Sequence, residues 1–157
     1  MGPHSVRYGF SQSFDFPAKM AFDWCTDYRP DDWARMGKEG KRRIRRINED
    51  TLILVDTVTG EDGPVAKQRL VRLNPERLAW TNTHLAGPNK HSQFWYQIVS
   101  RGRGKSRLDF TGLQVNYGKR PPAARIAEMA EELKADDSRT WTLLAKEMRK
   151  DLRKQER

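Results

Sequence analysis

The C-terminal stretch, residues 121–155, constrains the fold most strongly, because it has the pattern of one long amphipathic helix. Its apolar residues recur in steps of three and four, which places them on a single face. They are Ile126, Met129, Ala130, Leu133, Trp141, Leu144, Ala145, Met148 and Leu152. Pro121 and Pro122 mark the start, because proline is tolerated in the first turn of a helix and excluded from its interior. A helix with so wide an apolar stripe must lie against another layer of structure.

Asp137 falls in this stripe where an apolar residue is due. Two interpretations remain open. In the first, which we favour, Asp137 or Ser138 caps a second helical segment or faces solvent at a bend. In the second, Asp137 offers a carboxylate to a cavity beneath the helix.

The rest of the chain predicts a strand, two short helices and six further strands. Residues 5–15 alternate between apolar and polar, as in a half-buried strand, and Pro17 and Pro30 introduce the two helices. Turn residues then separate strands at 42–47, 51–59, 65–73, 77–85, 92–100 and 106–117. Hairpins at this spacing indicate one antiparallel sheet.

A sheet of about seven strands has one face to bury, and only the long helix is available to cover it. At 157 residues the chain is one domain, 1–157, by size. We therefore predict an α+β fold, in which a seven-stranded antiparallel curved sheet wraps around the C-terminal helix. A cavity between the two layers would be a natural ligand site.

The net charge of +9 raises the question of anionic partners. The densest basic run, Lys41–Arg46, could attract an anionic membrane surface or a ligand headgroup. Elsewhere basic and acidic residues alternate, as on a solvated helix face, so specific nucleic-acid binding is not expected. The sequence has neither an apolar run of signal-peptide length at its start nor a stretch long enough to span a membrane, and we expect a cytoplasmic protein.

Four segments share their pattern with a known group of proteins. Ser13–Pro17 and Ala21–Asp27 give a strand, a helix-starting proline and an aromatic helix that ends in aspartate. Val71–Trp80 gives a strand, a proline turn and an aromatic strand, and Gly102–Leu108 gives a last hairpin. Together they resemble the START-like superfamily, also called Bet v 1-like or SRPBCC, and particularly its polyketide cyclase/dehydrase-like members. The resemblance implies a helix-grip fold with a hydrophobic cavity for lipids, polyketides or other apolar ligands, and it brings no universal catalytic residues.

Aromatic residues on adjacent predicted strands and on the helix would line this cavity, although core packing alone explains most of them. The predicted cavity residues are Trp80, Asn82, His84, Phe94, Tyr96, Phe110, Met129, Leu133, Asp137 and Trp141. Alternation puts Phe94 and Tyr96 on one face of their strand and Trp95 on the other. His84 shares its face with Trp80 and Asn82, and we favour a hydrogen-bonded histidine at a strand end over a catalytic one.

No cofactor and no metal are expected. Residues 102–106 resemble the end of a phosphate-binding loop, but the first glycine of that motif and its following helix are missing. His84 and His91 flank a turn without the cysteine or acidic cluster that a zinc site needs. Cys25, the only cysteine, has no histidine nearby in sequence and is interpreted as a packing thiol.

Three functions remain possible from the sequence. The first is binding of a hydrophobic or lipid-like small molecule in the cavity. The second is a polyketide cyclase/dehydratase-like enzyme, for which Asp56, His84 and Tyr96 are the candidate acid/base groups. The third is a basic interaction module for RNA or membrane. The sequence does not decide whether any reaction is catalysed.

Overall fold

The structure is a computed structural model and describes residues 3–155. Seven strands, two short helices, one 3-10 turn and a long helix follow one another in the predicted order. They are β1 (His4–Phe14), α1 (Ala18–Cys25), α2 (Asp32–Arg35), β2 (Gly40–Asn48), β3 (Thr51–Gly60), β4 (Gly63–Asn74), η1 (Pro75–Arg77), β5 (Ala79–Ala86), β6 (Gln93–Ser100), β7 (Ser106–Asn116) and α3 (Ala123–Gln155).

The seven strands form one antiparallel sheet in the order β1-β7-β6-β5-β4-β3-β2. Consecutive hairpins account for every neighbour except β1, which pairs with the last strand, β7, with Phe10 opposite Phe110. The first strand therefore closes one edge of the sheet, and β2 forms the other edge. The predicted seven-stranded antiparallel sheet is confirmed.

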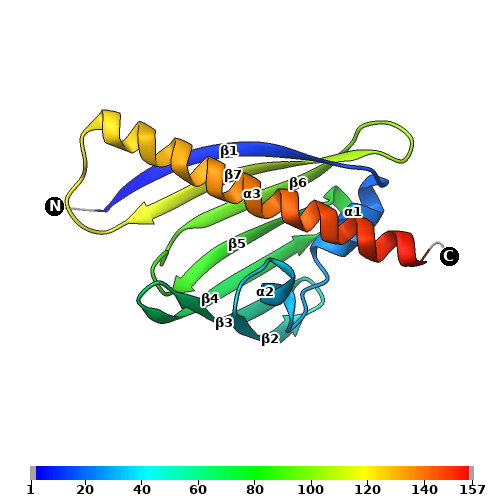
Figure 1. Cartoon of the computed structure of the whole chain (residues 1–157), viewed down its shortest axis with the longest axis horizontal. Helices are drawn as coiled ribbons and strands as arrows, with labels where there is room; N and C mark the ends of the chain where they lie inside the picture. Colours follow the sequence, from blue (N-terminus) through cyan, green and yellow to red (C-terminus); the bar gives the residue numbers. More distant parts are fainter. Residues whose placement is uncertain (1–2, 156–157) are drawn as a thin grey trace.

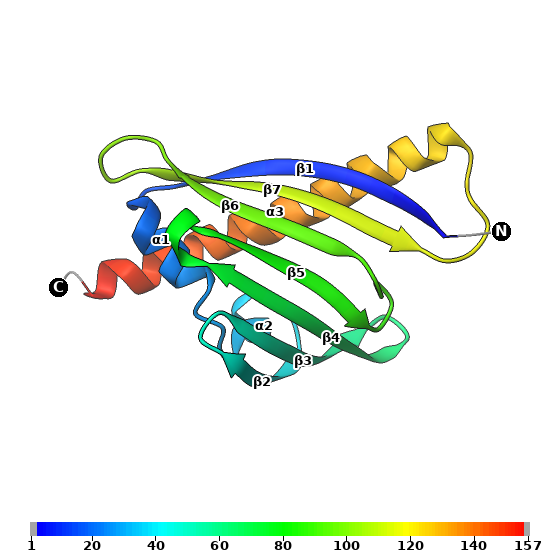
Figure 2. The same ribbon diagram turned by 180° about the vertical axis from the view of Figure 1, so that it is seen from behind.

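All three helices lie on one side of this curved sheet. Figure 1 shows α3 running across that side next to β1, α1 under the C-terminal part of α3, and α2 over the β2–β4 half. The view from behind shows the outer face of the sheet, which no helix in the described part of the chain covers (Figure 2). This is the helix-grip arrangement expected from the sequence.

The core lies between the sheet and the C-terminal half of α3. Met148 and Leu152 of the helix are buried in the same apolar cluster as Trp80 of β5. Further toward the start of the helix, Leu133 and Trp141 remain partly exposed. The helix is thus docked tightly at its C-terminal end, and space remains beneath its middle.

The favoured interpretation of Asp137 is wrong. Helix α3 is continuous from Ala123 to Gln155, so neither Asp137 nor Ser138 caps a second segment. Asp137 instead points toward the sheet, where the hydroxyl of Tyr8 donates a hydrogen bond to its carboxylate. Asp137 lies in the apolar stripe because it faces the sheet, in agreement with the second interpretation, in which it offers a carboxylate to a cavity beneath the helix.

The basic run on β2 is divided between the two faces of its strand. Arg42 is buried and faces inward, whereas Lys41, Arg43 and Arg45 are exposed. Because side chains alternate along a strand, Lys41, Arg43 and Arg45 share the exposed face, and Arg42 does not. Arg42 is therefore not part of the exposed basic surface.

Candidate ligand-binding cavity

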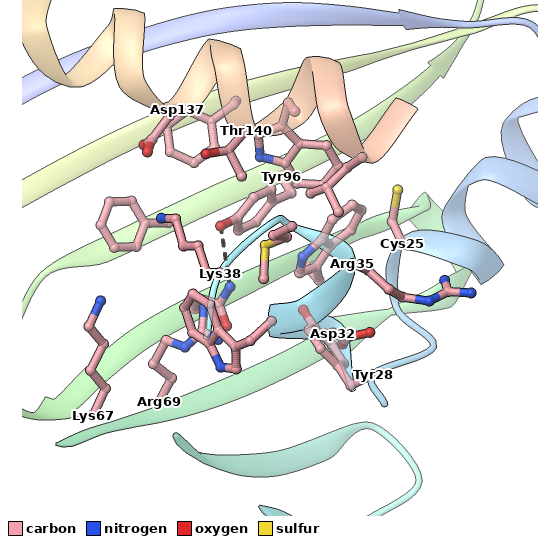
Figure 3. A pocket seen from close by; sticks show the side chains of 18 of the residues that line it. Cys25, Tyr28, Asp32, Arg35, Lys38, Lys67, Arg69, Tyr96, Asp137 and Thr140 are labelled. Atoms are coloured by element: carbon pink, nitrogen blue, oxygen red, sulfur yellow. Dashed lines mark hydrogen bonds between the residues drawn. The ribbon is translucent and has the colours of Figure 1, made fainter. Parts of the chain in front are cut away.

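A cavity of about 400 Å³ lies between the sheet, α3 and the α1–α2 segment. Inward-facing residues of β4, β5, β6 and β7 form its floor, and α3 contributes Leu133, Asp137, Trp141 and Leu144 from above. Side chains from α1 and α2 cover the remaining side (Figure 3). The volume falls within the usual range of small-molecule sites in proteins.

The walls of the cavity are largely aromatic. Trp80 and Tyr96 stack with their ring centroids 4.7 Å apart and 2° between the ring planes. Phe110 packs edge-on against Tyr96 at 5.2 Å, and Trp141 of α3 meets the same tyrosine at 6.0 Å. Such rings offer flat apolar surfaces and resist rearrangement, because each is held by its neighbours.

Two polar side chains on β5 face the cavity from the same side of the strand. Asn82 and His84 are only 3% and 5% exposed. The Asn82 amide donates a 3.3 Å hydrogen bond to the Tyr96 hydroxyl, but Asn82 Oδ1 and His84 Nδ1 have no hydrogen-bond partner among the described residues. The expectation of a hydrogen-bonded His84 side chain is therefore wrong, and both residues have hydrogen-bonding capacity that the protein does not use.

The imidazole of His84 is held in its neutral form. Burial lowers the pKa of His84 from 6.5 to about 3, and the positive charges of Arg69 and Lys67 act in the same direction. Its ring also packs edge-on against Phe94, with the centroids 5.3 Å apart. A neutral imidazole can donate from one ring nitrogen and accept at the other, which suits an orienting contact to a ligand.

Tyr8 and Asp137 form a second polar group in the lining of the cavity. The Tyr8 hydroxyl donates to Asp137 Oδ2, and Gly112 on the neighbouring strand leaves room for the tyrosine ring, since a Cβ there would lie 2.6 Å from Tyr8 Cε1. Burial raises the pKa of Asp137, although the hydrogen bond from Tyr8 opposes this effect. Burial and the nearby Asp137 carboxylate both raise the pKa of Tyr8.

Asp56 is satisfied by arginines and is not among the residues lining the cavity. Arg42 donates to it through Nε at 2.9 Å and through Nη2 at 3.1 Å, and Arg69 Nη2 donates at 2.9 Å. Burial opposes ionisation of Asp56, but the hydrogen bonds and charges of Arg42 and Arg69 outweigh it and lower its pKa. Asp56 is therefore an ion-pair partner rather than an acid/base group.

The α1–α2 segment that covers the cavity is tied to α3 through Asp151. Trp24 Nε1 donates to this carboxylate at 2.9 Å, and Arg35 binds it with two hydrogen bonds of 2.7 and 3.0 Å. Cys25 lines the same side of the cavity, and burial raises the pKa of its thiol. A protonated thiol in an apolar setting is a packing group rather than a nucleophile.

All of the predicted cavity residues except Met129 line the cavity. The cavity residues Tyr8, Phe94 and Phe110 form an apolar cluster, against which Leu133 of α3 packs. Met129, one turn earlier on α3, is not among the lining residues. Sequence reasoning did not include Tyr8, although its position on the apolar side of the first strand was a usable signal.

Six basic residues also line the cavity, and sequence reasoning placed none of them there. They are Arg29, Arg35, Lys38, Arg42, Lys67 and Arg69. Basic residues on a strand such as β4 or in a loop normally face solvent, so no pattern in the sequence indicated that Lys67, Arg69 or Lys38 lines a cavity. Within residues 3–155, no group of three histidine, cysteine or acidic residues could hold a metal ion. No helix in the described part of the chain is long and apolar enough to span a bilayer.

Comparison with known sequences finds neither a matching family model nor a matching curated protein. Solved structures, in contrast, match nearly the whole chain. The Zhui aromatase/cyclase from a Streptomyces species has a TM-score of 0.77 at 12% identity, covering 95% of this chain and 96% of its own. Ara h 8.0201 has a TM-score of 0.71 at 10% identity, covering 94% and 98%. A START superfamily protein from Mycobacterium smegmatis has a TM-score of 0.70 at 13% identity, covering 92% and 98%.

These similarities define the fold. The chain has the START-like fold, also called Bet v 1-like or SRPBCC, as the sequence segments had indicated. At such low identity the comparison carries no information on ligand or reaction, because one fold serves many functions. Function must be argued from the cavity itself.

Proposed function

We propose that this protein binds a hydrophobic or lipid-like small molecule in the cavity between its sheet and α3. A ligand that covers 150 to 250 Å² of aromatic wall would gain roughly 4 to 6 kcal/mol from apolar burial at about 25 cal/mol per Å². That energy supports micromolar binding once a few polar contacts are added. The aromatic walls supply the apolar surface, and the polar side chains of β5 supply the contacts.

One observation carries the proposal: Asn82 Oδ1 and His84 Nδ1 are buried and have no protein partner among the described residues. A buried polar atom without a hydrogen bond costs roughly 1 to 3 kcal/mol. Both atoms belong to residues that line the cavity, so a ligand that hydrogen-bonds to them would recover that cost. Core packing alone does not explain two neighbouring buried polar side chains, because it leaves their polar atoms without hydrogen bonds.

The test is direct binding of a neutral apolar probe. Protein freed of co-purified molecules is titrated with N-phenyl-1-naphthylamine, whose fluorescence rises in apolar surroundings, and we expect saturation at one probe per chain. Native mass spectrometry of the freshly purified protein, compared with the stripped protein, should reveal any molecule that the cavity retained.

Two variants on α3 decide whether the probe is in the cavity. Leu133→Trp places a large ring in the cavity and should abolish probe binding, whereas Leu143→Trp adds the same ring at an exposed position and should leave binding intact. If the first variant does not fold, as judged by circular dichroism, Thr140→Trp fills the same space. Absence of stoichiometric binding, or equal binding by filled and control variants, would refute the proposal.

We propose acid/base catalysis as a second candidate function, supported by the Tyr8–Asp137 pair. A buried carboxyl group whose pKa is raised, beside a phenol, is the kind of group that acts in general acid/base catalysis. Of the acid/base candidates named from the sequence, His84 and Tyr96 face the cavity and are kept. Asp56 is dropped, because it is ion-paired with Arg42 and Arg69. With a substrate identified from the retained molecule, Asp137→Asn should abolish turnover while leaving binding of the neutral probe unchanged. Unaltered turnover in Asp137→Asn and in His84→Ala would exclude this candidate.

A further inference from the structure

Three cationic side chains surround one corner of the cavity. Lys67 and Arg69 project from the same face of β4, and Lys38 enters from the loop after α2 (Figure 3). The ammonium groups of Lys38 and Lys67 lie 5.9 and 5.7 Å from the ring centroid of Trp33. The two ammonium groups therefore share a single buried indole ring, over which the Arg42 guanidinium also lies at 5.6 Å.

Two of these cations have no carboxylate partner. Neither Lys38 nor Lys67 forms an ion pair within the part of the chain that the structure describes, whereas Arg69 shares Asp56 with another arginine. Burial and the neighbouring charges of Arg69 and Lys38 lower the pKa of Lys67. Lys67 is partly buried, whereas Lys38 is exposed. Like charges held close together repel one another, and this makes the partly buried charge unfavourable unless an anion joins them.

The carboxyl group of Asp137, on the facing helix, does not remove this excess. It accepts the hydrogen bond of Tyr8, and burial raises its pKa, although the charges of Lys38 and Lys67 oppose that effect. One carboxyl group that ionises less readily does not balance the positive charges of Lys38, Lys67 and Arg69, so this corner of the cavity keeps a net positive charge. Arg69 Nε is in addition buried and without a hydrogen-bond partner among the described residues.

We infer that the ligand is a small organic acid, whose anionic group lies against Lys38, Lys67 and Arg69 and whose apolar part lies among the aromatic rings. This inference rests on the proposed binding function and adds the class of ligand. A carboxylate, sulfonate or phosphate would supply the missing negative charge and accept hydrogen bonds from the two ammonium groups and from Arg69 Nε. The apolar part would extend toward Trp80 and Tyr96, next to the unpaired atoms of β5.

A matched pair of probes separates the charge from the apolar part. 8-Anilinonaphthalene-1-sulfonate carries the ring system of N-phenyl-1-naphthylamine with one added sulfonate. The wild-type protein should bind the sulfonated probe more tightly. The double variant Lys38→Gln/Lys67→Gln should lose about tenfold or more in affinity for it, because charge-assisted hydrogen bonds are lost. Its affinity for the neutral probe should change much less.

The control is Lys41→Gln/Lys119→Gln, which removes two charges from exposed positions outside the cavity and should change neither affinity. A second measurement needs no variant: added salt should weaken binding of the sulfonated probe to the wild type and leave the neutral probe unaffected. If the neutral probe does not bind at one per chain, the proposed function fails. If it binds and the sulfonated probe responds neither to the two lysines nor to salt, only the inference on ligand class is overturned.

Discussion

Acidification should destabilise this protein through His84, and the structure gives the size of the effect. The imidazole is 5% exposed, and burial together with the charges of Arg69 and Lys67 lowers its pKa from 6.5 to about 3, with Asp56 acting weakly against them. The folded protein therefore holds His84 neutral at pH values where the unfolded chain has already bound a proton.

The sign and magnitude follow from linkage between protonation and folding. The pKa of His84 is lower in the folded state than in the unfolded state. The contribution of the neutral imidazole to the free energy of unfolding is therefore complete above about pH 6.5 and is lost as the pH falls toward 3. At about pH 4.5 the protonation of this one group in the unfolded chain lowers the free energy of unfolding by roughly 2 to 3 kcal/mol relative to neutral pH. That is a large fraction of the stability of a typical domain.

The assay is urea unfolding followed by tryptophan fluorescence at about pH 7 and pH 4.5, on protein stripped of bound molecules. The wild type is compared with His84→Asn, which cannot bind the proton, and with His91→Asn at an exposed histidine. The carboxyl groups titrate in all three proteins, so the difference between variants isolates the imidazole. His84→Asn should lose about 2 to 3 kcal/mol less than the other two on acidification. A pH dependence identical in all three proteins would refute the reasoning.

Two further substitutions test the packing around the cavity. Asp56→Asn leaves Arg42 and Arg69 without their shared carboxylate, and should lower the free energy of unfolding by about 3 to 5 kcal/mol, measured by urea denaturation; a loss below about 1 kcal/mol would show that the cluster is not a buried ion pair. Gly112→Ala places a Cβ 2.6 Å from the ring of Tyr8 and should cost about 1 to 3 kcal/mol. This cost should shrink in a Tyr8→Ala background, and additivity of the two changes would contradict the proposed clash.

The order and type of the elements could be predicted from the sequence because local periodicity determines which face of each element is buried. The steps of three and four after Pro122 and the strict alternation around Tyr8 each correspond to one face packed on the core. The same reasoning predicted the inward-facing residues of β5, such as Asn82 and His84, because one inward residue fixes the orientation of the others.

Contacts between distant segments could not be predicted in this way. Asp137 finds its partner 129 residues away on β1. Arg42 is buried with two carboxylates as partners, Asp56 on the paired strand and Asp32 of α2. A pattern of apolar and polar residues treats such groups as solvent-exposed. The inward turn of Lys67 was missed for the same reason, since nothing near it in sequence distinguishes a cavity cation from a surface one.

The polar residues that break the apolar pattern also explain why the space under α3 stays open. Helix α3 buries Met148 and Leu152 at its C-terminal end. About three turns earlier it presents Asp137, whose burial requires the hydrogen bond from the hydroxyl of Tyr8. The helix cannot pack more closely on the sheet at this point, because pressing the Asp137 carboxylate against the aromatic side chains would break its hydrogen bond with Tyr8. Opposite it, the partly buried Lys67 is equally costly to enclose in apolar surroundings. Tight docking at one end of the helix and polar groups at its middle therefore produce the cavity together, and its polar lining is a condition of its existence.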